Sequence, residues 1–380
     1  MPPRLDLSDV YSPAYRQELH DFKHYIGILL RQIFLRNFVA SGRLAQHPAP
    51  WFADPANHPT PTAFHFTRRL FEYLADCGEL SEVGGHWSPA PTLTDADPED
   101  SNIEAYLNDH PHNRRMYDFL RGVRDVSPRM LFQGEDSLLT MVMDDFHKSM
   151  ALWEDLMERA SVKAPGHDVI LRALKQLMAS SPLPITVFEG GAGIGAALRF
   201  ALQDPEFRAL SKKIGHYAFT DISLSLIKLG RAWIRRHDPE TLADRMTFKV
   251  VNLDKMELPE AFLQPQSVNA IVCENVLHDV TDFGYTLNKF HSMLKPGGSL
   301  IVTMAFRQRP RDFFMFEFMQ SSFHSYFNAK LEPGFRETYG WLTAGDWERS
   351  LKRAGFSRID FYPEEQDMPT WVFGGLVAWK

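Results

Sequence analysis

Cysteine is scarce in this sequence, because Cys77 and Cys273 are the only two among 380 residues. Two cysteines provide neither a disulfide framework nor a thiolate metal cage. No apolar run approaches the length of about 18 residues that a membrane-spanning helix needs. The first residues, MPPRLDLSDVYSP, lack the apolar core of a signal peptide. We therefore expect a soluble, cytoplasmic protein with no membrane partner and no bound metal.

Positive charge is not in excess either, since 41 Lys and Arg residues stand against 48 Asp and Glu, a formal net charge of −7. Nucleic-acid binding needs a basic face for the phosphates, so no nucleic-acid partner is expected. Hydrophobic residues make up 44% of the chain, enough for a packed core. The length indicates two or three domains. The 13% aromatic share suits a large apolar pocket, and a well-filled core would also explain it.

The first part of the chain mixes helical periodicity with proline-rich breaks. A helix is predicted over residues 13–40 and a second one in TAFHFTRRLFEYLADCGEL, followed by a short hairpin at Gly84-Gly85. In outline this order is similar to a winged helix. DNA binding is one interpretation, but Glu79 and Glu82 flank the hairpin and would repel phosphate, so a packing or dimerisation module is favoured.

A glycine-rich motif follows in ITVFEGGAGIGAALRF. Ile185–Phe188 is predicted to form a buried strand, and the glycines that follow it are predicted to form a tight loop. A helix is predicted to start at Ala196, with its free N–H groups facing a ligand. GAGIGA also fits the dinucleotide pattern G-x-G-x-x-A. Glu189 argues against the dinucleotide, because a carboxylate there would repel a diphosphate and could bind an ammonium group. A cationic nucleoside, S-adenosylmethionine, is the favoured ligand.

The following segments repeat the alternation of strand and helix. Asp221 ends the strand in HYAFTDIS, where it is placed to accept from ribose hydroxyls, and Asp254 ends MTFKVVNLD as a candidate partner of the adenine amino group. Asn269–Cys273 is a fourth strand that runs into a loop with His278. Ligands bind at this carboxyl edge of an open α/β sheet. Further along, Thr343 and Asp346 form the pattern of a helix-capping box, and two closing strands end the chain.

EGGAGIG, FTDIS, NLD, ENVLHDV and LKPGG resemble the motifs of class I S-adenosylmethionine-dependent methyltransferases over about residues 185–305. The chain also resembles natural-product O-methyltransferases and the C-methyltransferase domains of polyketide synthases. This resemblance implies an α/β fold with a Rossmann-like seven-stranded sheet over residues 166–380. A winged-helix-like dimerisation domain (1–100) and a helical linker or lid (101–165) would precede it. The resemblance also implies a cofactor site, formed by Glu189, Gly191, Gly193, Gly195, Asp221, Ile222, Leu253, Asp254 and Asn275.

The resemblance makes His278 the general base, a role that suits a side chain titrating near neutral pH. Without the resemblance, a helix-capping or core histidine is an equal alternative. In the relatives a glutamate at the end of the fifth strand orients this histidine, and here Met304 stands at that place. Asp279 is expected to point away from the imidazole, which leaves Glu317 as a candidate replacement.

An aromatic-rich segment, RDFFMFEFMQSSFHSYFNAKLEPGF, is predicted to cover a small acceptor or, alternatively, to form core between the domains. Candidate acceptor-binding residues are His147, Phe314, Glu317, Phe318 and His324. The acceptor atom is oxygen or carbon, with oxygen preferred because O-methylation is commoner in this architecture. Two further hypotheses remain, an NAD-dependent oxidoreductase and a catalytically inactive methyltransferase-like regulator.

Overall fold

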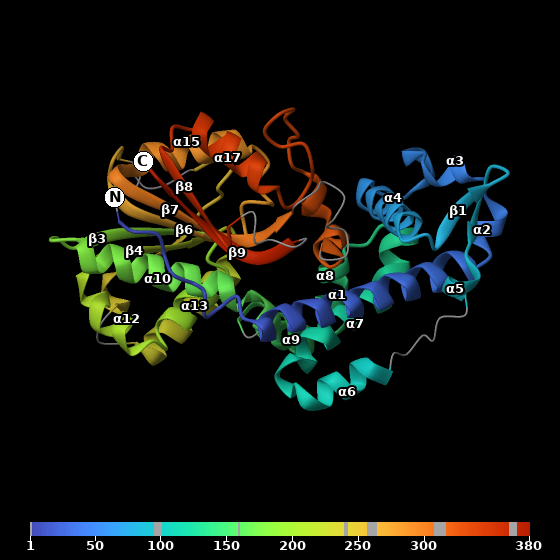
Figure 1. The fold of residues 1–380 in the computed structure, drawn as a ribbon, viewed down its shortest axis with the longest axis horizontal. Coiled ribbons are helices and arrows are strands. Elements are labelled where there is room, and N and C mark those ends of the chain that lie inside the picture. Colours follow the sequence, from blue (N-terminus) through green and yellow to red (C-terminus); the bar gives the residue numbers. More distant parts are fainter. Residues whose placement is uncertain are drawn as a thin grey trace. The chain divides into compact units, whose positions relative to one another are not determined.

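A computed structural model describes residues 2–94, 101–158, 160–238, 242–256, 264–307, 317–364 and 371–380. The chain divides into two compact units (Figure 1). The sheet unit comprises Met1–Tyr15, Val162–Pro310 and Ala329–Lys380, and the helical unit comprises Arg16–Ser161 and Arg311–Asn328.

The sheet unit is built on seven strands in the order β5-β4-β3-β6-β7-β9-β8. The strands are β3 (Ile185–Gly190), β4 (Ile214–Asp221), β5 (Met246–Val250), β6 (Val268–Glu274), β7 (Leu294–Arg307), β8 (Arg358–Tyr362) and β9 (Trp371–Trp379). The first five strands of this order are parallel, and β9 runs antiparallel to both β7 and β8. The predicted α/β class with a Rossmann-like seven-stranded sheet is confirmed. Chain order reverses between β3 and β6, the place in such sheets where ligands bind.

Helices cover both faces of this sheet. On one face lie α10 (Ala164–Ser180), α12 (Pro205–Leu210) and α13 (Leu224–His237), and on the other α15 (Phe283–Met293) and α17 (Ala344–Arg353) (Figure 1). The short helix α11 (Ala196–Ala201) follows the glycine-rich loop. Val169 and Leu174 of α10 belong to one buried core with Val187 of β3 and Val272 of β6. Burial of this apolar surface is what holds the helix layer to the sheet.

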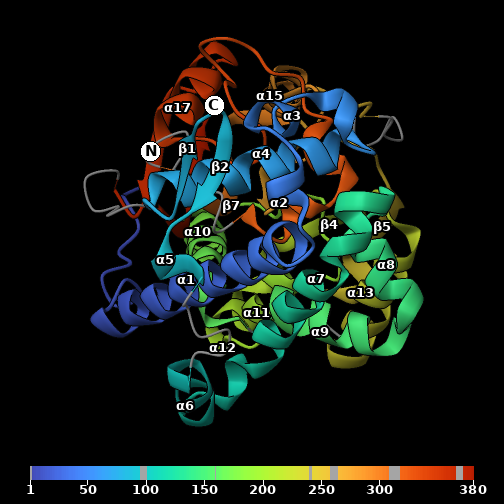
Figure 2. The ribbon, with the colours of Figure 1, turned by 90° about the vertical axis from the view of Figure 1, so that its right-hand side faces the viewer.

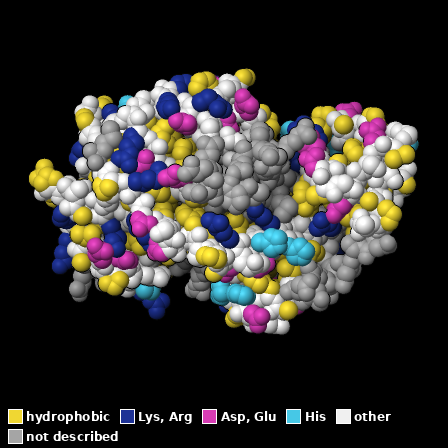
Figure 3. Space-filling model, viewed as in Figure 1, with side chains coloured by type: hydrophobic (Ala, Val, Ile, Leu, Met, Phe, Trp, Pro, Cys, Tyr) yellow, Lys and Arg dark blue, Asp and Glu magenta, His cyan; other side chains and the backbone are white. Residues whose placement is uncertain are grey.

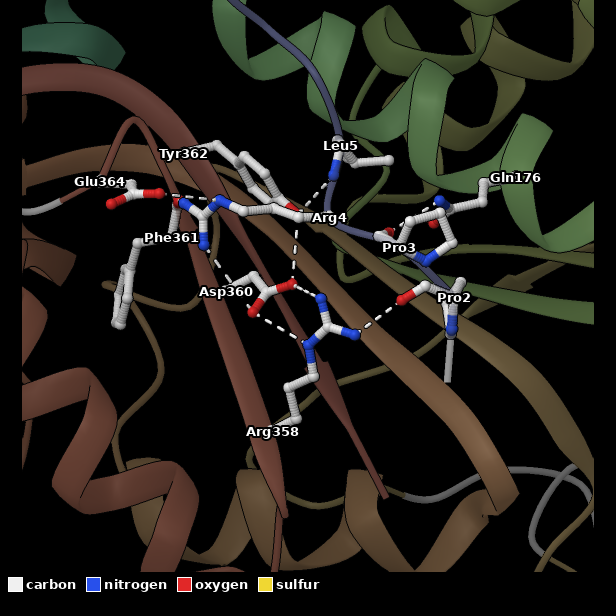
Figure 4. Close-up of polar contacts among 10 residues, drawn as sticks. All are labelled: Pro2, Pro3, Arg4, Leu5, Gln176, Arg358, Asp360, Phe361, Tyr362 and Glu364. Atoms are coloured by element: carbon white, nitrogen blue, oxygen red, sulfur yellow. Dashed lines mark hydrogen bonds and ion pairs between the residues drawn. The ribbon is translucent and has the colours of Figure 1, made fainter.

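Residues 2–5 lie against β8, the strand at one edge of the sheet (Figure 4). Arg4 pairs with Glu364 at 3.2 Å and donates to the Phe361 carbonyl. Arg358 donates to the Pro2 carbonyl at 2.7 Å, and the Leu5 amide donates to the Tyr362 hydroxyl at 3.0 Å. An exposed edge strand is a template for pairing with other chains, and this segment occupies part of it.

The helical unit holds most of α1 (Pro13–Phe34), which continues into a π-helical turn at Leu35–Val39. Its other elements are α2 (Arg43–Gln46), α3 (Ala49–Phe52), α4 (Pro61–Asp76), β1 (Leu80–Val83), β2 (His86–Pro89), α5 (Pro91–Thr94), α6 (Ser101–Asp109), α7 (Arg114–Gln133), α8 (Ser137–Asp144) and α9 (Phe146–Glu158). α1 lies next to α7 (Figure 2), where the Tyr25 and Tyr117 ring centroids are 4.3 Å apart. The predicted hairpin is present, with Gly84 and Gly85 at φ of 59° and 79°.

The unit boundaries differ from the predicted domain division. The sheet unit resumes at Val162, close to the expected boundary near residue 165, but it also contains residues 1–15. Residues 311–328 belong to the helical unit instead, and no boundary falls near residue 100. Hydrophobic periodicity along the chain does not reveal that a segment belongs to a unit distant from it in sequence, because this assignment depends on contacts between distant segments.

Charged side chains of both signs are interspersed on the part of the sheet unit that Figure 3 shows. Within the described ranges, no helix is long and apolar enough to cross a lipid bilayer.

Candidate active site

The glycine-rich loop joins β3 to α11, and three of its glycines adopt left-handed backbone conformations. Gly191, Gly193 and Gly195 have φ of 66°, 58° and 86°, values that side-chain-bearing residues rarely adopt. A Cβ atom on Gly191 would lie 2.3 Å from Val276 Cγ2, whereas one on Gly193 would meet nothing within 4 Å. The loop therefore packs tightly against the β6 side and leaves space beside the backbone at Gly193.

Asp221, at the end of β4, fixes the shape of this loop. Its Oδ2 accepts from the Gly193 amide at 2.8 Å, and its Oδ1 accepts from the Ser223 amide at 2.7 Å. Burial raises the pKa of Asp221, and the backbone donors offset part of that rise. The next residue, Ile222, is 66% exposed although it is apolar. An apolar side chain left in solvent beside a bare backbone suits contact with the flat face of a base or ribose.

Glu189 lies on the same face of the sheet as Val187, because side chains alternate along a strand. It is 1% exposed, and its Oε2 accepts from the Tyr217 hydroxyl at 2.8 Å. Burial raises the pKa of Glu189 to about 8; the negative charges of Glu274 and Asp221 add to the rise, and the Tyr217 hydrogen bond opposes it. This carboxyl group is therefore mostly protonated at neutral pH until a cation stabilises its charge.

A second buried cluster, formed by Lys163, His167 and Glu274, was missed by sequence reasoning. Glu274 Oε1 lies 3.0 Å from Lys163 Nζ and 2.9 Å from His167 Nε2. Burial opposes the charge of Glu274, but Lys163 and then His167 outweigh it and hold its pKa well below the usual range. Glu274 stands two residues after Val272, which pairs with Glu189 in the sheet, a register that the sequence alone does not give. Both carboxylates thus belong to one face.

His278 lies in the loop after β6, which starts with Asn275 at a left-handed φ of 48°. The imidazole is buried and stacks on the Trp341 ring, with centroids 4.7 Å apart and planes 27° from parallel. The expectation that Asp279 points away from it is wrong, because Asp279 Oδ2 lies 3.3 Å from His278 Nε2. A turn in the loop brings the neighbouring carboxylate back toward the ring.

Asp254 and Leu253 follow β5 at the same edge of the sheet. Asp254 Oδ1 accepts from the Thr281 amide at 2.6 Å, and its Oδ2 accepts from the Thr281 hydroxyl at 2.9 Å. Asp254 thereby ties its segment to the loop that carries His278. Leu253 is buried, and its Cδ2 would be 3.1 Å from a Cβ added to Gly190. The adenine contact of Asp254 stays a prediction.

The residues predicted for the acceptor belong to the helical unit, whereas His278 and the predicted cofactor residues belong to the sheet unit. Glu317 is fully buried and forms an ion pair with Arg69 at 2.7 Å, and Phe318 is fully buried too. His147 and His324 are exposed. Phe314 lies outside the described residues. The structure therefore gives Glu317 an arginine partner within its own unit.

The site fits a cationic nucleoside better than a dinucleotide. Glu189, Asp221 and Glu274 face the same side of the sheet, where a diphosphate would add negative charge beside the two acidic groups and further oppose ionisation of Glu189. An ammonium or sulfonium group would be attracted there. The open backbone at Gly193 and the exposed Ile222 provide a cradle for the uncharged part of such a ligand.

Comparison with known proteins identifies the same region. Residues 188–300 match the family model described as a methyltransferase domain. Similar curated proteins include the hybrid PKS-NRPS synthetase thnA of Trichoderma harzianum, 25% identical over 311 residues, which are 81% of this chain and 7% of that protein. Another is the polyketide synthase component of lovastatin nonaketide synthase of Aspergillus terreus, 25% identical over 320 residues, 82% of this chain and 9% of that protein. This chain thus spans less than a tenth of the length of either relative.

Two solved structures share the fold over nearly the whole chain. The CurJ carbon methyltransferase is 18% identical with a TM-score of 0.73, and the alignment covers 98% of this chain and 96% of that one. The CMeT domain of the citrinin polyketide synthase is 18% identical with a TM-score of 0.71, covering 100% of this chain and 98% of that one.

Proposed function

We propose, from the premise that this chain is an S-adenosylmethionine-dependent methyltransferase of the class I fold, that its acceptor is a carbon atom of a polyketide-type acyl chain. One observation carries the choice of acceptor. The likeness to the two carbon methyltransferases extends over 98–100% of this chain, so it includes the helical unit as well as the sheet. The curated relatives are polyketide synthases. We therefore favour carbon over the oxygen acceptor that architecture alone suggested.

The donor site in this proposal is the carboxyl edge of β3, β4 and β5. S-adenosylmethionine supplies an electrophilic methyl group on a positively charged sulfur. Glu189 attracts the amino-acid end of the donor, Asp221 accepts from its ribose hydroxyls, and Ile222 contacts its base. The remaining residues of the site are Gly191, Gly193, Gly195, Leu253, Asp254 and Asn275. Orientation of the two reactants in one pocket is worth roughly 7–11 kcal/mol of the barrier.

His278 is the general base of the proposal. A carbon between two carbonyl groups carries an acidic hydrogen, and its removal leaves a nucleophilic enolate. The imidazole takes this proton, and Asp279, whose Oδ2 is 3.3 Å from Nε2, stabilises the resulting positive charge. The enolate carbon then bonds to the methyl carbon as the methyl–sulfur bond breaks and its electron pair stays on sulfur. A positioned base of this kind contributes about 10²–10⁴-fold in rate.

The remaining expectations also enter as proposals. His147, Phe314, Glu317, Phe318 and His324 would face the acceptor. The hairpin-bearing part of residues 1–100 would pair two copies, which size-exclusion chromatography coupled to light scattering tests directly. We further propose a cytoplasmic protein that acts on a small molecule and binds no nucleic acid.

A β-ketoacyl thioester and a phenol, each offered with S-adenosylmethionine, separate the acceptor classes. We expect a mass gain of one methyl group, less the replaced hydrogen, on the α-carbon of the thioester and none on the phenol. In the absence of donor, the wild type should also exchange α-deuterium of the thioester for solvent hydrogen, and His278→Gln should not. Methylation of the phenol alone, or unchanged exchange by His278→Gln, would contradict the proposal. Binding of NAD instead of S-adenosylhomocysteine would restore the oxidoreductase hypothesis.

A further inference from the structure

Trp341 lies before α17, far along the chain from the loop that carries His278. Its ring is 1% exposed and stacks on the imidazole over a centroid distance of 4.7 Å. Its indole Nε1 donates to Asn275 Oδ1 at 3.2 Å, across a sequence separation of 66 residues. The indole is therefore held from one side by its own hydrogen bond and presents a face to the histidine.

Asn275 is itself held in place. Its amide donates to the Thr303 carbonyl of β7 at 2.6 Å, and its φ of 48° is one that asparagine tolerates better than most residues. Arg336, which is 1% exposed, donates to the carbonyls of His278 and Val280. Backbone and ring of His278 are thus fixed by separate partners, the backbone by Arg336 and the ring by Trp341.

We propose that Trp341 is the positioning residue of His278: it fixes the plane of the imidazole and favours the protonated ring that forms once the acceptor has lost its proton. This inference rests on the proposed role of His278 as base. The face of an indole ring carries negative electrostatic potential and attracts a cation placed over it. A neutral imidazole gains little from that potential, so the stacking is stronger after proton transfer than before it, which is the property that lowers a barrier.

Among the described residues, the charged side chains of Asp279 and Arg336 also bear on His278. Asp279 Oδ2, 3.3 Å from Nε2, also favours the protonated ring, but its side chain is 43% exposed and solvent weakens its effect. Arg336 opposes protonation through its positive charge, although its contact is with the backbone carbonyl. The effect of Trp341 on protonation of His278 must therefore be distinguished from the effect of Asp279, and the variant Asp279→Asn serves as the comparison.

The experiment combines fluorescence with the pH dependence of turnover. A protonated imidazole in contact with an excited indole quenches its emission by accepting an electron. We expect emission of the free wild-type enzyme to fall as pH is lowered, with the same midpoint as the pH profile of kcat/KM. The quenching should be absent in His278→Gln and in Trp341→Phe. Trp347→Phe is the matched control, because Trp347 is equally buried but contacts Phe283 instead of the histidine.

Substitution of Trp341 should change kcat without changing donor affinity. For Trp341→Leu we expect kcat to fall at least tenfold, the midpoint of its pH profile to move down by roughly 0.4–1.5 units, and the dissociation constant for S-adenosylhomocysteine to stay within twofold. Trp341→Phe keeps an aromatic face, so its kcat and the midpoint of its pH profile should lie between those of the wild type and those of Trp341→Leu. If Trp341→Leu does not fold, Asn275→Gly provides a second test, because it keeps the backbone conformation and removes the acceptor of the indole N–H. We expect Asn275→Gly to lower kcat and to weaken the quenching. Asn275→Asp, which restores an acceptor oxygen, should recover both.

The outcomes separate this inference from the proposed function. Wild-type turnover by His278→Gln would overturn both, because His278 would not be the base. An inactive His278→Gln together with an unshifted, fully active Trp341→Leu would overturn the inference alone. Identical pH dependence of emission in the wild type and in His278→Gln would overturn it as well.

Discussion

Glu189 yields the sharpest prediction, because its protonation should be coupled to donor binding. With a pKa of about 8, this carboxyl group is ionised in about 1% of molecules at pH 6 and in about 9% at pH 7. A positively charged donor selects the ionised form. The dissociation constant for S-adenosylmethionine should therefore fall about ninefold between pH 6 and pH 7. Above that range the amino group of the ligand itself begins to lose its proton, since such groups titrate at about 7.7–8.0.

Isothermal titration calorimetry at pH 6.5, in buffers of different ionisation enthalpy, measures the protons exchanged on binding. We expect the wild type to release close to one proton per donor bound. Glu189→Gln, which has the same shape but no ionisation, should bind more weakly, release none and show a dissociation constant that is flat from pH 6 to pH 7. A flat profile in the wild type, or the same slope in Glu189→Gln, would refute the reasoning.

The same shift predicts how stability depends on pH without a ligand. The pKa of Glu189 is raised above its unfolded value of 4.5, so the folded state keeps a proton that the unfolded state loses. Stability is therefore lost as pH rises from about 4.5 to about 8, by roughly 3 kcal/mol at pH 7. Urea denaturation should show this decline in the wild type and a weaker one in Glu189→Gln. An equal loss of stability in the wild type and in Glu189→Gln would mean that a group other than Glu189 holds this proton.

Two further predictions concern the backbone and the buried ion pair. Gly191→Ala should lose donor binding at least tenfold more than Gly193→Ala, because both have positive φ but only the first Cβ would collide with Val276; equal losses in a calorimetric titration would contradict this. Lys163→Met should cost roughly 3–5 kcal/mol of unfolding free energy, since it leaves Glu274 charged and buried with one partner fewer. The double variant with Glu274→Gln should recover part of that loss in urea denaturation, and no recovery would argue against the pair.

Much of the proposed donor site could be described from the sequence because its features are local in sequence. The glycine loop and the capping box of Thr343 with Asp346 follow from short patterns, and the structure contains both, whereas the strand expected to end at Asp254 ends at Val250. The methyltransferase resemblance that those patterns suggested agrees with the family model matched over residues 188–300, and the expected fold is confirmed by the solved structures. Helix α15 likewise begins with a local cap, because the Asp282 side chain accepts from the Tyr285 amide.

The surroundings of His278 were not predictable for the opposite reason. Trp341 and Arg336 reach the loop across 66 and 58 residues of sequence, and no periodic pattern links such positions. Glu317, the expected carboxylate partner of His278, is paired with Arg69 instead, and the adjacent Asp279, expected to point away, lies beside the imidazole. Loop conformation decided that outcome, and hydrophobic patterning says little about the direction of a loop side chain.

The division of the chain into two interleaved units bears on the order in which it folds during synthesis. Residues 16–161 are synthesised before residues 317–328, so Arg69 gains its buried partner only when residue 317 has been made. The sheet is completed later still, because β9, the last strand of the sequence, lies between β7 and β8. Arg4 forms its contact with Phe361 of β8 across a sequence separation of 357. Contacts this distant in sequence form slowly. Nascent chains halted before residue 371 should therefore expose β7 and β8 as unpaired edges and depend on chaperones until the last strand inserts.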